Sequence, residues 1–108
     1  MFSINGIYWQ IIFVPPGSKI LRRSDGSGTV GVTDNATKTV YLSELLCGAF
    51  LKKVLCHEIC HCACFSYGCS FAPDTEELIA DFLATYGEEV LSIADTVFYQ
   101  ITKREVIA

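Results

Sequence analysis

The pattern of hydrophobic and polar positions changes its period once along the chain, close to residue 43. Before that point, β-branched and aromatic residues gather in short runs, which predict strands at residues 7–14, 28–33 and 38–42. The last two runs flank the segment Asp-Asn-Ala-Thr at residues 34–37, whose turn chemistry predicts a β-hairpin. The N-terminal half of the chain is therefore expected to form a small sheet.

Beyond residue 43 the apolar residues recur at helical spacing. Residues 44–65 predict a first helix with Ser43 as its N-cap, and residues 75–86 predict a second, which Gly87 is expected to end. Residues 90–101 predict a third, amphipathic helix. Strands followed by helices predict an α+β fold, with a small antiparallel sheet of about three strands packed on about three helices.

Composition and charge narrow the class of protein. The 108 residues suffice for one domain, so residues 1–108 are expected to form a single folding unit. Hydrophobic residues make up 51% and charged residues 19%, which excludes an intrinsically disordered chain. The formal net charge of −4 argues against a nucleic-acid partner, because neutralising phosphates requires a basic surface. The sequence shows neither a membrane span nor a secretory signal, so we expect a cytoplasmic protein with no membrane partner.

A short segment in the first predicted helix carries recognisable chemistry. His57-Glu58-Ile59-Cys60-His61 has the form H-E-x-x-H and contains the only two histidines of the chain. Residues four apart on a helix share one face, so both imidazoles can reach one zinc ion. Glu58 then lies beside the metal, where its carboxylate can take a proton from a zinc-bound water. The alternative is that both histidines are ordinary residues near a helix surface.

A catalytic zinc site needs a third protein ligand, which here must be a carboxylate or a thiolate. In the second predicted helix Glu77 and Asp81 are four apart and share a face, so Asp81 can support a ligand histidine while Glu77 binds the metal. Glu76 is the rival ligand, although it lies about 100° away around the helix and has Ala80, not an acid, four residues later. Glu77 could also serve as a capping-box residue for Asp74.

These residues resemble the pattern of a known group of enzymes. The pattern is His57-Glu58-x-x-His61 followed by Glu77-x-x-x-Asp81, which is similar to that of the gluzincin metallopeptidases. Residues 77–84 resemble the corresponding helix of the ImmA/IrrE-type metallopeptidases, and residues 40–43 are also similar to that family. The resemblance runs over residues 28–86, and the small size is similar to that of the stand-alone minigluzincins.

The resemblance implies a minimal zincin-like catalytic domain that holds one Zn(2+) per chain. In the gluzincins the downstream glutamate is the third zinc ligand and the following aspartate supports a ligand histidine, which implies these roles for Glu77 and Asp81. A peptide or protein substrate, a cytoplasmic location and a phage or mobile-element setting are implied in the same way. The chain departs from the family at Cys60, Cys62 and Cys64, which replace small apolar residues around the second histidine.

The sequence therefore predicts a small zinc-dependent metalloendopeptidase in which His57, His61 and Glu77 bind the metal and Glu58 is the general base. The alternative is a non-catalytic zinc-binding module with a regulatory or structural role, in which a fourth protein ligand closes the metal site. Self-association that blocks the site is a further expectation for so hydrophobic a chain. The sequence does not indicate which residues bind the substrate.

Five of the six cysteines lie between residues 56 and 69, and we expect reduced thiols. Cys56, Cys60 and Cys64 are spaced four apart and form a stripe beside the two histidines, which favours core packing. A redox role or a second, sulfur-ligated metal site that includes Cys62 or Cys69 is the alternative.

Two further features are candidates for substrate handling. One strand of the hairpin, at residues 28–32 or 38–42, can pair with an extended peptide at a sheet edge, or the hairpin is purely structural. Tyr67 and Tyr86 are candidates for stabilising an oxyanion.

Overall fold

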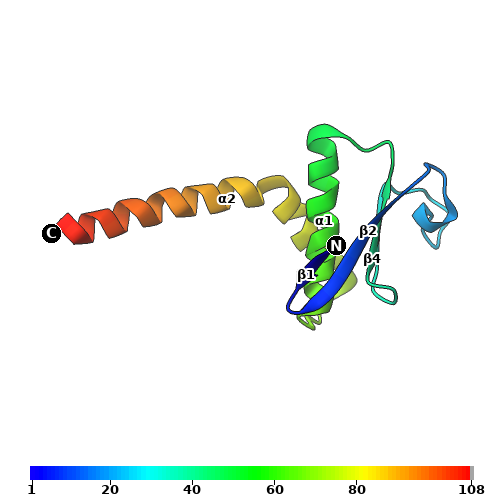
Figure 1. The fold of residues 1–108 in the computed structure, drawn as a ribbon, viewed down its shortest axis with the longest axis horizontal. Helices are drawn as coiled ribbons and strands as arrows, with labels where there is room; N and C mark the ends of the chain where they lie inside the picture. The colour runs from blue at the N-terminus through cyan, green and yellow to red at the C-terminus, as the bar shows by residue number, and fades with distance from the viewer. Residues whose placement is uncertain (108) are drawn as a thin grey trace.

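The computed structural model describes residues 1–107 and shows a sheet, a helix packed on one face of it, and a long second helix (Figure 1). The elements are β1 (Phe2–Ile4), β2 (Ile7–Val14), the 3₁₀ helix η1 (Lys19–Leu21), β3 (Gly31–Asp34), β4 (Thr39–Ser43), α1 (Gly48–Ser66) and α2 (Pro73–Ile107). The α+β class is thus as predicted. The number of strands and helices is not.

The sheet has four strands in the order β1-β2-β4-β3 and is mixed. β1 pairs with β2, and β3 with β4, in antiparallel fashion, whereas β2 and β4 run parallel. The prediction of a purely antiparallel sheet of three strands was therefore wrong. β1 was missed because it has only three residues, although Asn5-Gly6, both with positive φ, form the tight turn that often joins two strands. The parallel pair arises because residues 15–30 carry the chain back across the sheet before the predicted hairpin.

The hydrophobic core lies between the sheet and α1. Trp9, Val40 and Leu42 project from the central strands toward α1, where they meet the fully buried Cys62. Successive side chains of a strand point to opposite faces of the sheet, so these residues share the face toward α1. This alternation of apolar and polar positions is the pattern from which the strands were predicted. The indole nitrogen of Trp9 donates a 2.8 Å hydrogen bond to the hydroxyl of Ser66, so the end of α1 is fixed to the sheet.

α1 begins at Gly48 and not at the predicted residue 44. Ser43 is a buried residue of β4, paired with Val14, so it cannot cap a helix that starts one residue later. Cys47 occupies the N-cap position, and Gly48 takes a φ of +60°, which turns the chain out of the strand. The end of the helix, one residue beyond the predicted 65, agrees with the apolar pattern.

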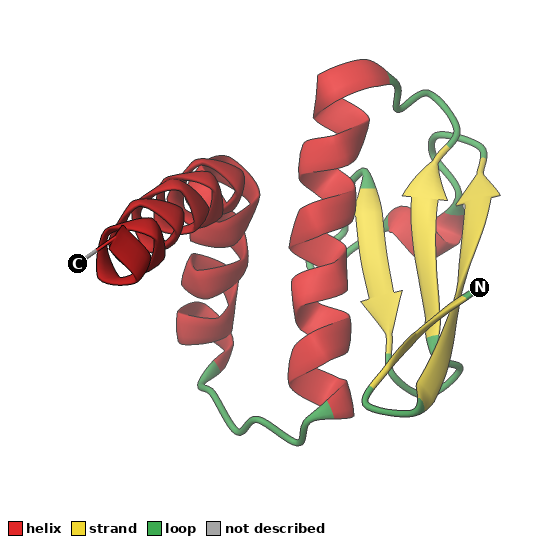
Figure 2. Cartoon of the chain, turned by 60° about the vertical axis from the view of Figure 1, so that its left-hand side comes forward, coloured by secondary structure: helices red, strands yellow, loops and turns green. Residues whose placement is uncertain are grey.

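α2 is one helix of 35 residues where two were predicted. Gly87 does not end it: its φ is not positive, and a single glycine inside a helix costs only about 1 kcal/mol. The first turns of α2 run alongside α1, and the helix then turns away from the rest of the molecule (Figures 1 and 2). We call the projecting residues 88–103 the arm. The molecule measures 61 × 30 × 27 Å, and the arm extends along the longest of these dimensions (Figure 1). Within residues 1–107, no helix combines the length and the apolarity needed to cross a membrane.

Candidate metal centre

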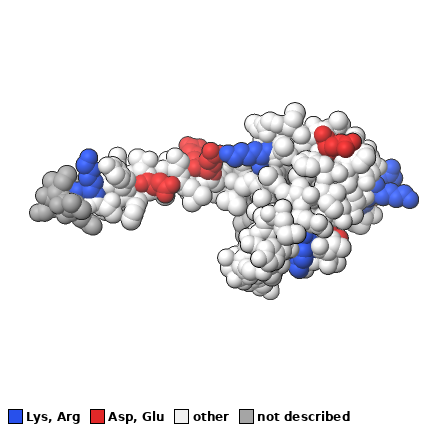
Figure 3. Space-filling model, viewed as in Figure 1, with Lys and Arg blue, Asp and Glu red and all other residues white. Residues whose placement is uncertain are grey.

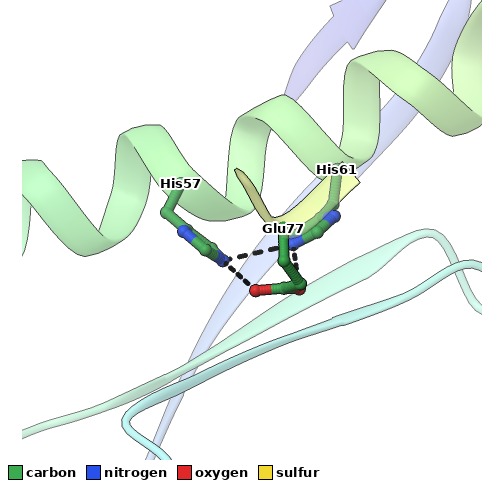
Figure 4. Close-up of side chains that lie close together, drawn as sticks. All are labelled: His57, His61 and Glu77. Atoms are coloured by element: carbon green, nitrogen blue, oxygen red, sulfur yellow. Dashed lines mark hydrogen bonds and ion pairs between the residues drawn. The ribbon is translucent and has the colours of Figure 1, made fainter. Parts of the chain in front are cut away.

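Three of the predicted ligands converge between α1 and α2. His57 and His61 project from one face of α1, and Glu77 reaches them from the second turn of α2 (Figure 4). The two Nε2 atoms are 3.2 Å apart, and the carboxylate of Glu77 places Oε2 3.2 Å from Nε2 of His57 and Oε1 2.9 Å from Nε2 of His61. One ligand atom from each residue lies within 4.8 Å of the others, so the group can hold a metal ion.

The outer nitrogens of both imidazoles also meet carboxylates. Asp81 Oδ1 is 2.8 Å from Nδ1 of His57, which is the supporting position predicted for it. Glu76, predicted only as a rival ligand, instead has Oε2 2.5 Å from Nδ1 of His61. The early turns of α2 run antiparallel to α1 (Figure 2), so the earlier acid faces the later histidine. The sequence shows two adjacent acids, Glu76 and Glu77. Only the direction in which α2 packs on α1 determines that Glu77 faces Nε2 of His61 and Glu76 faces Nδ1.

The hydrogen bonds at Nδ1 of each imidazole determine whether its Nε2 carries a proton or a free lone pair. A carboxylate accepts hydrogen bonds, so in a neutral ring Nδ1 carries the proton and donates it to Asp81 or Glu76. Each Nε2 is then a bare lone pair. These two lone pairs and the carboxylate of Glu77 are three acceptors aimed at one point, with no donor among them. Such an arrangement is stable when a cation lies between the three groups.

The spacing of these atoms fits zinc. Two atoms that bind Zn²⁺ at about 2.05 Å in tetrahedral geometry lie roughly 3.3 Å from each other. Here the two Nε2 atoms are 3.2 Å apart. The nearer oxygen of Glu77 is 3.2 Å from Nε2 of His57 and 2.9 Å from Nε2 of His61. In the described part of the chain the group contains three residues, which is the ligand number of zinc sites that keep one position open.

Glu58 lies beside this group and is held by β3. Its side chain is buried, with 7% of the residue exposed, and its Oε1 accepts a 2.8 Å hydrogen bond from the hydroxyl of Thr33. A Cβ at Gly31 would lie 3.2 Å from Oε2 of Glu58 and 3.0 Å from a methyl group of Val54, so a side chain here would require these neighbours to shift by a few tenths of an ångström. Neither contact could be predicted from the sequence, because no local pattern shows which strand residues face the motif.

A cleft of about 720 Å³ opens over these residues. β3 forms one wall; it is one of the two edge strands of the sheet and contributes Gly31, Val32 and Thr33. Of the two hairpin strands considered for peptide binding, β4 is excluded, because it pairs with β2 on one side and β3 on the other. The rest of the cleft is lined by charged and aromatic residues that include Arg23, Lys53, Phe50 and Phe65.

The two tyrosines proposed as oxyanion donors lie elsewhere. Neither is among the residues of the described chain that line the cleft. Tyr67 follows the end of α1 and is 62% exposed, while the ring of Tyr86 packs 5.3 Å from that of Phe82 on the outside of α2. The arrangement gives neither tyrosine access to the metal-binding group.

All six cysteines are free thiols. In the stripe predicted to pack, Cys60 and Cys64 are buried, whereas Cys56 is only half-buried. The cysteine that belongs to the core cluster is Cys62, which was considered for a second metal site. Burial raises the pKa of Cys62 to about 12 and that of Cys64 to about 11, so both thiols are protonated at neutral pH when no metal is bound. Among the described residues, the histidines and Glu77 form the group with metal-ligand spacing, and no set of three cysteines does.

Comparisons with protein-family models, with curated proteins and with solved structures found no match to this chain. What the protein does must therefore be argued from the geometry of the site.

Proposed function

We propose that this protein is a small zinc-dependent endopeptidase of the gluzincin type, similar to the ImmA/IrrE metallopeptidases and the minigluzincins. One observation carries the proposal. Two imidazole lone pairs and the carboxylate of Glu77 converge on one point, and a buried glutamate stands beside them in an open cleft. The three converging ligands suit zinc, and the buried glutamate beside them suits a reaction at the open coordination position of the metal.

Each acidic residue of the site has a separate task. Glu77 binds the metal with the two histidines, while Asp81 and Glu76 hold the imidazole rings in the tautomer that leaves Nε2 free. A bound zinc ion would lower the pKa of water toward 7 and polarise the carbonyl of the scissile bond. Glu58 accepts a proton from the attacking water and then donates it to the leaving amine.

The cleft has the form that an extended peptide requires. β3 is an edge strand, so its free main-chain groups can pair with a substrate strand that passes over the motif. The residues that select the substrate are then those around this strand. We infer a peptide or protein substrate, and the family resemblance points to a regulatory protein in the cytoplasm of a cell that carries a phage or mobile element.

The competing hypothesis is a zinc module without catalytic activity. A purely structural site would fill the fourth position with a protein ligand and would have no use for Glu58. Here the metal-binding group of the described chain has three members, and Glu58 lines the same cleft as that group. These two features favour the enzyme.

The test combines metal content with cleavage of a peptide library. Protein purified under reducing conditions without chelator should contain close to one zinc per chain and should cleave a subset of peptides. Glu58→Gln should keep the zinc and lose activity by roughly 10²–10⁴-fold, because it removes the general base. The control is Glu88→Gln, which alters an exposed acid that is paired with Lys52 outside the site.

Two outcomes would contradict the proposal. If Glu58→Gln cleaves as fast as the wild type, the mechanism is wrong. If the wild type binds zinc but cleaves no peptide at dilutions that dissociate any oligomer, the protein is the non-catalytic module.

A further inference from the structure

The arm meets the body of the molecule at its first turn, where Glu88 pairs with Lys52 of α1, and beyond that turn it projects into solvent. Every residue from 88 to 103 is exposed except Thr102, which is partly buried, and the arm projects away from the sheet and α1 (Figure 1). An isolated helix of about 16 residues is marginally stable in water, because few hydrogen bonds offset the cost of nucleation. Packing against another surface would provide the missing stabilisation.

One face of the arm is continuously apolar. With about 100° per residue, its apolar residues fall within roughly 160° of the helix circumference, and the polar residues occupy the rest. The residues of this apolar face are Val90, Leu91, Ile93, Ala94, Val97, Phe98 and Ile101. The large ones are 44–68% exposed, with Val97 at the lower limit and Phe98 at the upper. A face this clean is typical of a helix that packs against another apolar surface.

The spacing of the apolar residues indicates that the partner is also a helix. From Leu83 onward, apolar residues and Gly87 recur at alternating intervals of four and three, up to Ile101. The full series is Leu83, Gly87, Val90, Ala94, Val97 and Ile101. This heptad pattern keeps one seam facing a second helix in a left-handed pair.

We propose that the arm pairs with the arm of a second copy of this chain, forming a dimer. A second copy presents the same heptad seam, so each apolar face can cover the other. The charged side chains of the arm (Figure 3) are Glu88, Glu89, Asp95 and Lys103. They lie roughly 120–160° around the helix from the centre of the apolar face, so they remain in water when the two faces meet.

The available surface is sufficient for such a pair. The six large side chains of the apolar face expose on the order of 100 Å² each, or about 600 Å² per copy and about 1,200 Å² for the pair. Stable interfaces bury roughly 1,200–2,000 Å² in total, so the arm alone reaches the lower limit. We therefore expect a reversible dimer.

A membrane surface is a less suitable occupant. Helices that lie on membranes carry Lys and Arg on their polar face, which attract anionic lipids. The polar face of the arm instead carries Glu88, Glu89 and Asp95 against Lys103 among the described side chains. Anionic lipid headgroups would repel this face.

The experiment measures mass against concentration by sedimentation or light scattering, with the full chain. The wild type should change from monomer to dimer over the micromolar range. Phe98→Glu places a charge in the apolar face and should raise the dissociation constant at least 10-fold. The matched control is Tyr99→Glu, on the polar face and similarly exposed, which should dimerise as the wild type does. Retained zinc binding in both variants shows that the site is intact.

The proposal is overturned if the wild type stays monomeric at high micromolar concentration. It is also overturned if Phe98→Glu and Tyr99→Glu dimerise equally well, or if the wild type is monomeric and binds vesicles of anionic lipid. None of these results depends on peptidase activity, so this inference and the proposed function can fail separately.

Discussion

At the scale of single residues, two turns of α2 supply three carboxylates with different tasks. Glu77 faces the inner nitrogens of the imidazoles, while Glu76 and Asp81 each face one outer nitrogen. The side chain of Glu76 is 17% exposed, compared with 56% for Glu77 and 70% for Asp81. Because electrostatic contacts are stronger when shielded from water, Glu76 should be the more effective of the two supporting acids.

We predict that Glu76→Ala weakens zinc binding by 10–100-fold, about the cost of removing a supporting carboxylate from a metal-binding histidine. Removing Glu77 itself, as in Glu77→Ala, should cost more, because it deletes a ligand. Zinc affinity can be measured by competition with a chromophoric chelator, with Glu88→Gln as the surface control. Unchanged affinity in Glu76→Ala would show that its contact with His61 does not support the metal site.

At the scale of the elements, a glycine in the connection between α1 and α2 and a glycine inside α2 have opposite effects on stability. Gly68, just after α1, has a φ of +67°, which residues with a side chain rarely adopt. Gly87 lies inside α2 without a positive φ, and the added Cβ would meet only atoms of Leu83 within 4 Å. The closest of these is a terminal methyl carbon at 2.7 Å on a side chain that is 38% exposed and can move aside.

We therefore predict that Gly87→Ala raises the free energy of unfolding by about 0.5–1 kcal/mol, because alanine is the better helix former. Gly68→Ala should lower it by roughly 1–2 kcal/mol, the cost of a left-handed conformation for an L-residue. Denaturant unfolding of both variants measures the difference. Destabilisation by Gly87→Ala would mean that Leu83 cannot move and that the packing of α2 depends on the glycine.

At the scale of the whole molecule, the metal-binding group is also a structural link. His57 and His61 belong to α1, and the three acids belong to α2, so the site joins the helix that carries the core to the helix that carries the arm. An ion bound there stabilises the folded chain by mass action, since the ligands are brought together only on folding.

We predict that zinc raises the midpoint of thermal unfolding and that a chelator lowers it again. Glu77→Ala should remove most of this difference, whereas Lys52→Ala, which breaks an exposed ion pair with Glu88, should leave it intact. The stabilisation by zinc should decrease as the pH is lowered, because protons compete with the metal for imidazole and carboxylate ligands. Scanning calorimetry at several pH values tests this prediction. An equal effect of zinc on Glu77→Ala would place the ion elsewhere.

The sequence by itself determined the features that depend on local spacing. Residues four apart share a face of any helix, so the pairing of His57 with His61 and of Glu77 with Asp81 could be predicted without a fold. The α+β class, the strand at residues 7–14 and the hairpin followed from periodicity and turn chemistry in the same way. Start points were predicted less well: the strand expected from residue 28 begins at Gly31, and the helix expected from residue 44 begins at Gly48.

Only the tertiary structure decided the features that join distant segments. The antiparallel packing of α2 on α1 puts Glu76 beside His61, and the position of β3 brings Thr33 to Glu58. The tertiary structure also decided that β2 pairs parallel with β4 and that α2 continues through Gly87. The physical reason for the contacts is that they depend on the direction in which the elements pack, which no local pattern contains. The reason for the continuous helix is that a single glycine costs too little to end a helix whose first turns are held against a neighbour.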